Sequence, residues 1–249
     1  MNSEAIATLL QGLSGEYSFY YAKDGETPIS FSNQAAGHQF LTASVIKVPI
    51  LLAWIMLERQ GKVAADEICD VGMEPVVEGS GFFYLFRQKK VTWHDILLMM
   101  IGTSDNYCTN LIISHVGMET LNQVFTEDLS LIDTHLGRKM MSQPDKASNR
   151  DNWMVAADLV RCFEVIEDFN QQERKFSEEM LLACQSDNLF QRNLPGDTID
   201  FYHKSGGLHN VINEWGYTKD RRIFLFCNNF TDYLAVLNVF GTLGLELLL

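Results

Sequence analysis

The sequence predicts an α+β fold in which an antiparallel sheet, flanked by helices, carries an inserted all-helical lobe. Strand-like segments occur near both ends of the chain, residues with helical spacing fill the middle, and an apolar helix-like segment closes the sequence. Because strand-like segments return at the end of the chain before the last helix, we expect the strands of the two chain ends to share one antiparallel sheet.

The first elements are a short helical pattern at residues 4–13 and two β-rich segments at 17–22 and 28–31. Residues 23–26 between the two segments contain Asp24 and Gly25, which are typical of a turn, so we expect a hairpin. Helical spacing then recurs at residues 45–57, 93–100, 107–116, 119–125, 153–166 and 177–182. Strand-like segments return at 199–203, 211–217 and 223–226, before a last helix from Tyr233.

These elements predict a single domain over residues 1–249. Its sheet lobe is expected at about 1–43 and 196–249, and its helical lobe at about 44–195. We find no internal repeat and no segment with the composition of an interdomain linker.

Composition excludes several classes of function. The formal net charge of −13 disfavours nucleic acid, whose binding proteins neutralise phosphates with Lys and Arg. The five cysteines are scattered and form no zinc spacing, so we expect reduced core residues, no metal and no cofactor. The expected partner is a small-molecule substrate, and the sequence leaves the oligomeric state unknown.

The location of the protein is also an expectation. No Lys or Arg precedes Lys23, so a secretory signal with a basic start is absent and the chain as written is expected in the cytoplasm. The alternative is an exported form whose signal is missing from this chain. The apolar segment after Tyr233 contains Gly, Asn and Glu246 and falls short of the ~20 uninterrupted apolar residues of a membrane span, so we expect no membrane partner.

The first element with chemistry is Ser44-Val45-Ile46-Lys47. Residues three apart on a helix share a face, so a neutral Lys47 amine could hydrogen-bond Ser44 and take its hydroxyl proton during attack. Chance supplies about 0.6 S-x-x-K matches per chain of this composition, and the alternative is an ordinary helix start. The following VPILLAWIML is apolar all round and predicts a buried helix, with an irregular first turn caused by Pro49.

The second element is Ser104-Asp105-Asn106, predicted to lie between two helices. Ser104 could relay a proton, and the Asn106 amide could hold Lys47 and a substrate amide. Chance supplies about 0.06 such triplets, although either occurrence could also be a plain cap or turn. The chain has a second copy at residues 186–188, which we interpret as unrelated to the chemistry because it lies only eighteen residues before Lys204 and no buried helix follows it.

The third element is Lys204-Ser205-Gly206-Gly207, predicted at the end of a strand. A Lys at a strand edge offers a cation to a substrate carboxylate, Ser205 adds a contact, and the glycines permit close approach of a backbone. A simple glycine turn is the alternative. Chance supplies about 0.08 K-[ST]-G matches per chain, so coincidence is a poor explanation for the joint occurrence of all three elements.

These motifs, which stand here as SVIK, SDN and KSG, resemble the class A serine β-lactamases and the penicillin-binding proteins. The resemblance implies a β-lactamase/transpeptidase-like fold over most of the chain. It also implies that Ser44 is acylated, Lys47 activates it, Ser104 passes the proton and Asn106 orients. Lys204 and Ser205 would then hold the substrate carboxylate, and the N–H groups of Ser44 and Gly207 would form the oxyanion hole.

One departure from the family lies in the loop at residues 133–151. The family carries R-x-E-x-x-x-N there, and aligning Arg138 with its Arg places Met140 where the Glu that activates the deacylating water should stand. Arg138 is expected to pair with Asp151 across the loop, and Asp145 is a candidate substitute base. A positioned general base contributes about 10² to 10⁴ in rate, so deacylation is expected to be slow.

Several functions remain open at this point. The chain could hydrolyse β-lactams or a related amide with Lys47 serving both half-reactions. It could instead be a D-alanyl peptidase-like enzyme or a small-amide hydrolase like the serine-dependent glutaminases. A different class is a non-hydrolysing binder or sensor that traps a β-lactam as a long-lived adduct.

Overall fold

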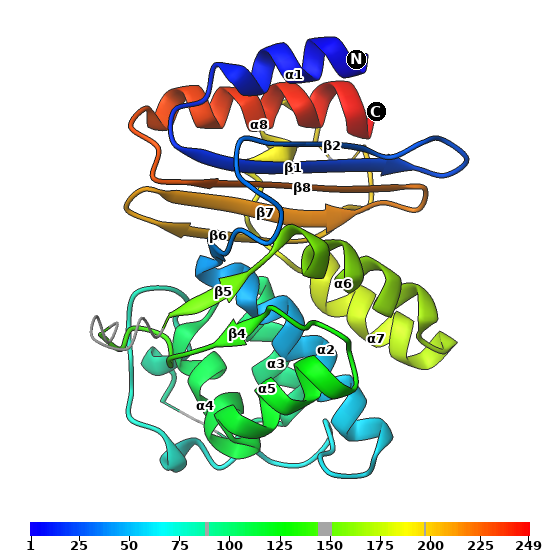
Figure 1. Cartoon of the computed structure of the whole chain (residues 1–249). Coiled ribbons are helices and arrows are strands. Elements are labelled where there is room, and N and C mark those ends of the chain that lie inside the picture. Colours follow the sequence, from blue (N-terminus) through cyan, green and yellow to red (C-terminus); the bar gives the residue numbers. More distant parts are fainter. Residues whose placement is uncertain (88–89, 144–150, 197) are drawn as a thin grey trace.

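A five-stranded antiparallel sheet forms the centre of the molecule, in the strand order β2-β1-β8-β7-β6. The computed structural model describes residues 1–87, 90–143, 151–196 and 198–249. Strands β1 (Glu16–Lys23) and β2 (Ile29–Ser32) come from the start of the chain. Strands β6 (Tyr202–Leu208), β7 (Val211–Tyr217) and β8 (Arg221–Asn228) come from its end, which confirms the predicted shared sheet (Figure 1).

Helices α1 (Ser3–Gln11) and α8 (Tyr233–Leu248) cover one face of this sheet, and the two chain termini lie side by side at one end of it (Figure 1). Successive side chains of β8 point to opposite faces of the sheet, and both faces are buried. Ile223 and Leu225 pack in the core under α1 and α8, whereas Phe224 and Phe226 pack in the core on the other face. This explains the unbroken apolar run IFLF in the sequence.

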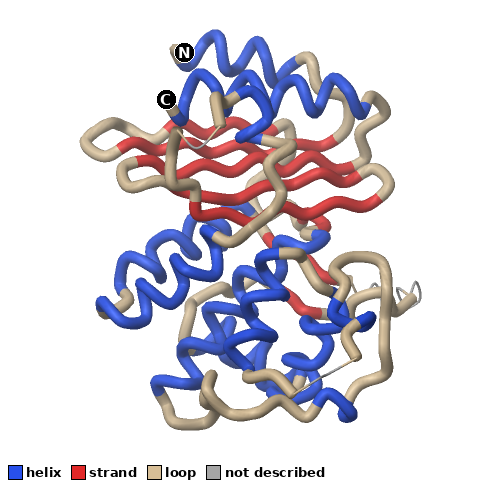
Figure 2. Tube along the Cα trace, turned by 180° about the vertical axis from the view of Figure 1, so that it is seen from behind, coloured by secondary structure: helices blue, strands red, loops and turns tan. Residues whose placement is uncertain are grey.

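The second face of the sheet carries the remaining helices, as the view from behind shows (Figure 2). They are α2 (Lys47–Arg59), α3 (Trp93–Gly102), α4 (Asn106–Val116), α5 (Met118–Glu127), α6 (Ala156–Asp168) and α7 (Gln171–Leu182). Ten of the thirteen residues of α2 are buried, so the prediction of a buried helix after Ser44 is confirmed. Short 3₁₀ helices are η1 (Ala43–Ile46), η2 (Val71–Met73), η3 (Phe83–Leu85) and η4 (Phe190–Asn193).

A small three-stranded sheet among these helices was not predicted. It joins β3 (Phe40–Leu41), β5 (Asn152–Met154) and β4 (His135–Leu136) in the order β3-β5-β4. Trp153, expected in a helix, therefore lies in a strand, and α6 begins only at Ala156. Strands of two or three residues are too short to show a repeating pattern, which is why sequence periodicity missed them.

The third sequence element lies inside a strand and not at its end, so its predicted position was wrong. Strand β6 begins at Tyr202 and continues through both glycines to Leu208, where Gly206 pairs with Asn213 and Gly207 with Ile212 of β7. Glycines are common in turns, which led to the wrong prediction. Their role in the strand is explained by the site described below.

The five cysteines are free and buried. Four of them lie in the core as expected, whereas Cys184 lines the cavity described below. No helix in the part of the chain that the structure describes is long and apolar enough to cross a membrane.

Candidate active site

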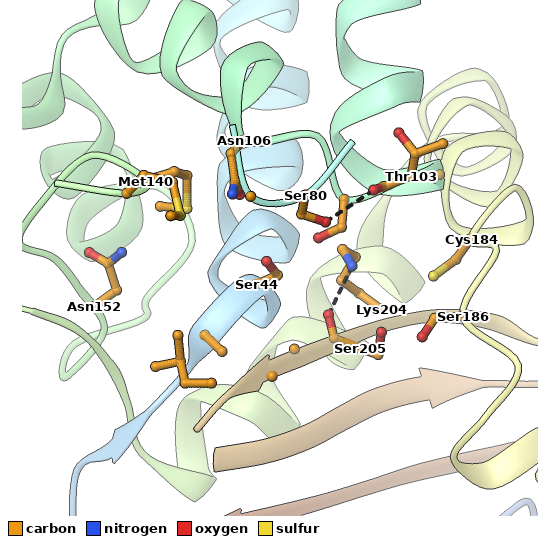
Figure 3. A pocket seen from close by; sticks show the side chains of 18 of the residues that line it. Ser44, Ser80, Thr103, Asn106, Met140, Asn152, Cys184, Ser186, Lys204 and Ser205 are labelled. Atoms are coloured by element: carbon orange, nitrogen blue, oxygen red, sulfur yellow. Dashed lines mark hydrogen bonds between the residues drawn. The ribbon is translucent and has the colours of Figure 1, made fainter. Parts of the chain in front are cut away.

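The three sequence elements meet at one cavity of about 640 Å³. Its walls include Ser44 from the first element, Ser104 and Asn106 from the second, and residues 204–207 from the third. Figure 3 shows Ser44 in the middle of this cavity, with Lys204 and Ser205 on one side and Met140 and Asn152 on the other. Residues 60 to 160 positions apart in sequence therefore face one space.

Ser44 lies in the 3₁₀ helix η1, directly before α2. The irregular first turn that Pro49 predicted is thus present, and Ala43 begins it with a φ of 47°, a conformation that L-residues rarely adopt. Strand β6 packs against the backbone of this turn. A Cβ atom at Gly206 would lie 2.7 Å from the Ser44 amide nitrogen, so only glycine fits at this position.

Lys47 is fully buried behind Ser44, at the start of α2. Its Nζ donates to the Ser104 carbonyl oxygen at 2.6 Å, to Ser104 Oγ at 3.1 Å and to Asn106 Oδ1 at 3.1 Å. These bonds engage all three donors of an ammonium group. The hydrogen bond to Ser44 that helical spacing predicted is therefore replaced by contacts with the second element.

The charge state of Lys47 is set by this burial. Removal from water lowers the pKa of the amine well below its usual range, and the cation of Lys204 lowers it further. Asp105 acts in the opposite direction and is a weaker influence. The arrangement thus favours a neutral amine at Lys47, as the sequence predicted.

The second element occupies the turn between α3 and α4, and Asp105 holds it in place. One carboxylate oxygen of Asp105 caps α4 by accepting from the Cys108 N–H at 3.0 Å, and the other accepts from the Phe83 N–H at 2.8 Å. Ser104 has a φ of 55°, so its backbone is in the left-handed region. Such a conformation persists only where the surroundings enforce it, and here these hydrogen bonds do so.

The segment at residues 78–83 supports the second element and was missed by sequence reasoning. The Asn106 side chain donates to the Glu78 carbonyl at 3.3 Å, and the Asn106 N–H donates to the Ser80 carbonyl at 3.0 Å. Ser80 also lines the cavity. The glycines at 79 and 81, both with positive φ, were the sequence signal for this tight loop.

Lys204 points into the cavity from strand β6 and is 1% exposed. Its Nζ donates to the Ser205 carbonyl at 2.8 Å, and burial lowers the pKa of its amine, which Cys184 and Glu214 partly offset. The lining thus offers a desolvated amine beside the Ser205 hydroxyl. A substrate carboxylate there would favour the charged form of the amine.

The loop that carries Met140 closes the side of the cavity opposite Lys204. The Met140 N–H donates to Asn110 Oδ1 at 2.8 Å, and Asn110 Nδ2 donates back to the Met140 carbonyl at 3.1 Å. The predicted ion pair of Arg138 with Asp151 is present, with Nε and Oδ1 at 2.8 Å. Asp145, the candidate substitute base, lies outside the described residues.

The second SDN copy contributes to the cavity through its serine. Ser186 lines the wall near Lys204 together with Cys184 and Gln185, although Lys47 bonds to the first copy. Sequence reasoning missed these three residues because it took the short separation of Ser186 from Lys204 as a reason to set the second copy aside, and the lining shows that this reason was wrong for Ser186. Among the residues that the structure covers, no group of three or more His, Cys, Asp or Glu side chains could hold a metal ion.

Comparison with known proteins identifies relatives for nearly the whole chain. The model of the beta-lactamase enzyme family matches residues 2–238. A β-lactamase from Sphaerobacter thermophilus superimposes with a TM-score of 0.82 at 23% identity, covering 98% of this chain and 95% of that one. An ancestral class A β-lactamase gives 0.82 at 20% identity over 97% and 96% of the chains. PBP-A gives 0.79 at 20% identity over 98% and 94%.

At these identities the structural likeness shows a shared fold. Comparison with curated proteins gives no match.

Proposed function

Because the chain belongs to the beta-lactamase enzyme family, we propose that it is a serine hydrolase that is acylated at Ser44 by β-lactams or a related amide bearing a carboxylate. The observation that carries this proposal is the burial of Lys47, which follows Ser44 by three residues, is hydrogen-bonded to the second element and feels the charge of Lys204. A buried amine near a like charge loses its proton easily, and a neutral amine can accept the proton of the attacking hydroxyl.

In the proposed acylation, Ser44 Oγ attacks the substrate carbonyl while Lys47 takes up its proton. Ser104 Oγ, 3.1 Å from Lys47 Nζ, can then pass a proton to the leaving nitrogen. Asn106 orients the amine and the substrate amide. Lys204 and Ser205 hold the substrate carboxylate, and the N–H groups of Ser44 and Gly207 stabilise the oxyanion.

We further propose that the acyl-enzyme is long-lived. The thioether of Met140 lines the cavity but cannot take a proton from water. Asp151 also lines it, but its carboxylate is engaged in the ion pair with Arg138. PBP-A has the same fold, and the structure of one of its mutants is that of an acyl-enzyme complex with penicillin G.

The same feature supports a second candidate function, a β-lactam binder or sensor that does not hydrolyse its ligand. If deacylation is slower than the lifetime of the protein, acylation itself is the signal. The two candidates share the chemistry at Ser44 and differ only in the fate of the adduct.

A chromogenic cephalosporin and intact-protein mass spectrometry test the proposal. We expect one equivalent of cephalosporin to be opened rapidly, followed by slow turnover, with the adduct on the peptide that contains Ser44. A burst with no later turnover would favour the sensor. The Ser44→Ala variant is the control and should give neither the burst nor the adduct. A wild-type protein that forms no adduct with penicillins or cephalosporins would contradict acylation by this substrate class.

A further inference from the structure

A second nucleophile lines the same cavity. Cys184 follows α7, and Figure 3 shows its sulfur on the side of Lys204 and Ser186. The serine chemistry proposed above does not use this thiol. The other four cysteines lie in the protein core, where burial raises their thiol pKa; they are Cys69, Cys108, Cys162 and Cys227.

The thiol is coupled to a buried ion pair on the far side of strand β6. His203 lies next to Cys184 and lowers the pKa of its thiol, and its Nδ1 lies 2.7 Å from Glu214 Oε1. Both partners are almost inaccessible, at 1% and 0% exposed. Glu214 also accepts from the Phe190 N–H at 2.8 Å, and the uncharged amide of Gln191 lies 3.0 Å from His203 Nε2. A carboxylate at this distance stabilises the protonated form of a buried imidazole.

This coupling determines the charge of Cys184. Burial alone would raise the pKa of the thiol, but the hydrogen bond and charge of His203 and the charge of Lys204 together lower it to about 7. Burial alone would lower the pKa of His203, but its contacts with Cys184 and Glu214 raise it to about 10. A thiolate beside an imidazolium that a carboxylate orients is the arrangement of an activated cysteine nucleophile.

We propose that Cys184 is a modification site inside the cavity, where it forms a mixed disulfide with a small disulfide that carries a carboxylate. The Cys184 thiolate attacks one sulfur of the ligand, a new S–S bond forms, and the ligand's own S–S bond breaks. The released thiolate leaves with the electron pair and takes its proton from water. Lys204 supplies the cation that attracts the ligand carboxylate to this wall of the cavity.

The adduct would occupy the wall where the proposed function places the substrate carboxylate. Modification of Cys184 therefore closes the cavity to substrates of Ser44, and a reducing thiol reopens it. Cys184 is a different nucleophile from Ser44, so its modification does not depend on whether Ser44 is acylated.

Thiol titration with dithiobis(nitrobenzoate), a coloured disulfide with two carboxylates, tests the site. We expect one of the five thiols to react in the native protein and the other four only after unfolding. The reaction rate should reach half its maximum near pH 7. The native reaction should disappear in Cys184→Ser and persist in Ser44→Ala, which separates this site from the proposed function. Reaction that survives in Cys184→Ser, or a native protein with no reactive thiol, would overturn the proposal.

Two further variants test how the thiolate is formed. His203→Asn should slow the reaction at pH 7 at least about threefold and shift its midpoint above pH 8, because an ordinary thiol has a pKa of ~8.5 and its gain in nucleophilicity only partly compensates. Glu214→Gln should act in the same direction and serves where His203→Asn fails to fold. Rates and midpoints unchanged in folded variants would contradict the activation of Cys184 by this pair.

The charge preference is tested with Lys204→Gln and two reagents. The variant should react more slowly than wild type with dithiobis(nitrobenzoate), and the loss should be smaller with the neutral disulfide dithiodipyridine. Equal losses with both reagents would contradict a carboxylate-bearing ligand.

Discussion

At the scale of single residues, the proposed chemistry depends on the proton of Lys47. The side chain is buried, its amine bonds to Ser104 and Asn106, and burial and the charge of Lys204 lower its pKa. Removing a charged amine from water costs far more than removing a neutral one, so the site favours the neutral base. A protonated amine can donate to all three acceptors and a neutral amine to two of them, so hydrogen bonds hold the group in place in either state.

The first prediction is a pH dependence of acylation. The pKa of Lys47 is depressed, so the amine is neutral above that lowered pKa and protonated below it. The rate of penicillin acylation should therefore fall as the pH is lowered through a value well below the usual ~10.4. Quenched-flow mass spectrometry of the Ser44 adduct measures this rate.

Lys47→Arg is the control for this prediction. A guanidinium keeps its proton at every accessible pH, so acylation should be slower by about 10² to 10⁴ throughout. A wild-type profile that rises only near pH 10 would show that Lys47 has an ordinary pKa and would exclude it as the base.

At the scale of elements, the contact between strand β6 and the turn η1 positions Ser44. A Cβ atom at Gly206 would meet three backbone atoms, the Ser44 nitrogen and the Thr42 oxygen at 2.7 Å and the Val45 nitrogen at 2.9 Å. Backbone cannot yield as a flexible side chain can, so any larger residue must push the strand and the turn apart. The glycine is needed because the two elements approach so closely.

The second prediction concerns this contact. Gly206→Ala should lower the acylation rate at least about tenfold, because a shift of about 1 Å at the nucleophile is costly for a positioned reaction. The matched control is Gly196→Ala, where a Cβ would meet nothing within 4 Å. Equal acylation rates in the two variants would show that the separation of β6 and η1 is not critical.

The loop that carries Met140 is the second decisive element. Its backbone is held by Asn110 at both the N–H and the carbonyl, independently of the Met140 side chain. The ion pair of Arg138 with Asp151 joins the two arms of the loop. A new side chain at position 140 should therefore stand in the same place.

The third prediction follows from that rigidity. Met140→Glu should speed deacylation by about 10² or more, because it adds a carboxylate base beside the acyl group. Met140→Gln has the same shape without the base and should leave deacylation slow. Decay of the penicilloyl adduct, followed by mass spectrometry, measures both. If the two variants lose the adduct at the same rate, the absence of a base at position 140 is not what limits turnover.

At the scale of the whole molecule, the cavity lies where the sheet meets the helices, so its geometry depends on how the two pack. Trp215 of β7 is one of the links. Its ring stacks on Phe163 of α6 with centroids 4.4 Å apart and planes 12° apart, and its Nε1 donates to the Leu159 carbonyl at 2.9 Å. Both partners belong to α6, so this side chain ties the helix to the sheet.

The fourth prediction is a loss of stability when this link is weakened. Trp215→Phe removes ring area and leaves a buried carbonyl with one partner fewer, so the free energy of unfolding should fall by about 1–3 kcal/mol. Urea denaturation measures the change.

The control for ring size is Trp153→Phe. The indole nitrogen of Trp153 is buried without a hydrogen-bond partner in the described part of the chain, so its loss removes no hydrogen bond. A Trp153→Phe variant that loses as much stability as Trp215→Phe would mean that the bond to Leu159 contributes little.

The sequence by itself determined the features that depend on local patterns. Strand-like segments at both chain ends predicted the shared sheet, the run after Lys47 predicted the buried helix α2, and Pro49 predicted the irregular turn at Ser44. The pairing of Arg138 with Asp151 was implied by the resemblance of this loop to that of the class A β-lactamases, and it is present. Each of these features leaves a signal in the residues that form it, as periodicity, composition or a restricted backbone.

Only the tertiary structure decided which side chains meet. It directs Lys47 to Ser104 and Asn106, places Gly206 inside a strand against Ser44, and brings Cys184 to the cavity wall. It also forms the small sheet from strands of two or three residues. Contacts of this kind depend on how distant elements pack, and the segments involved are too short or too irregular to carry a period of their own.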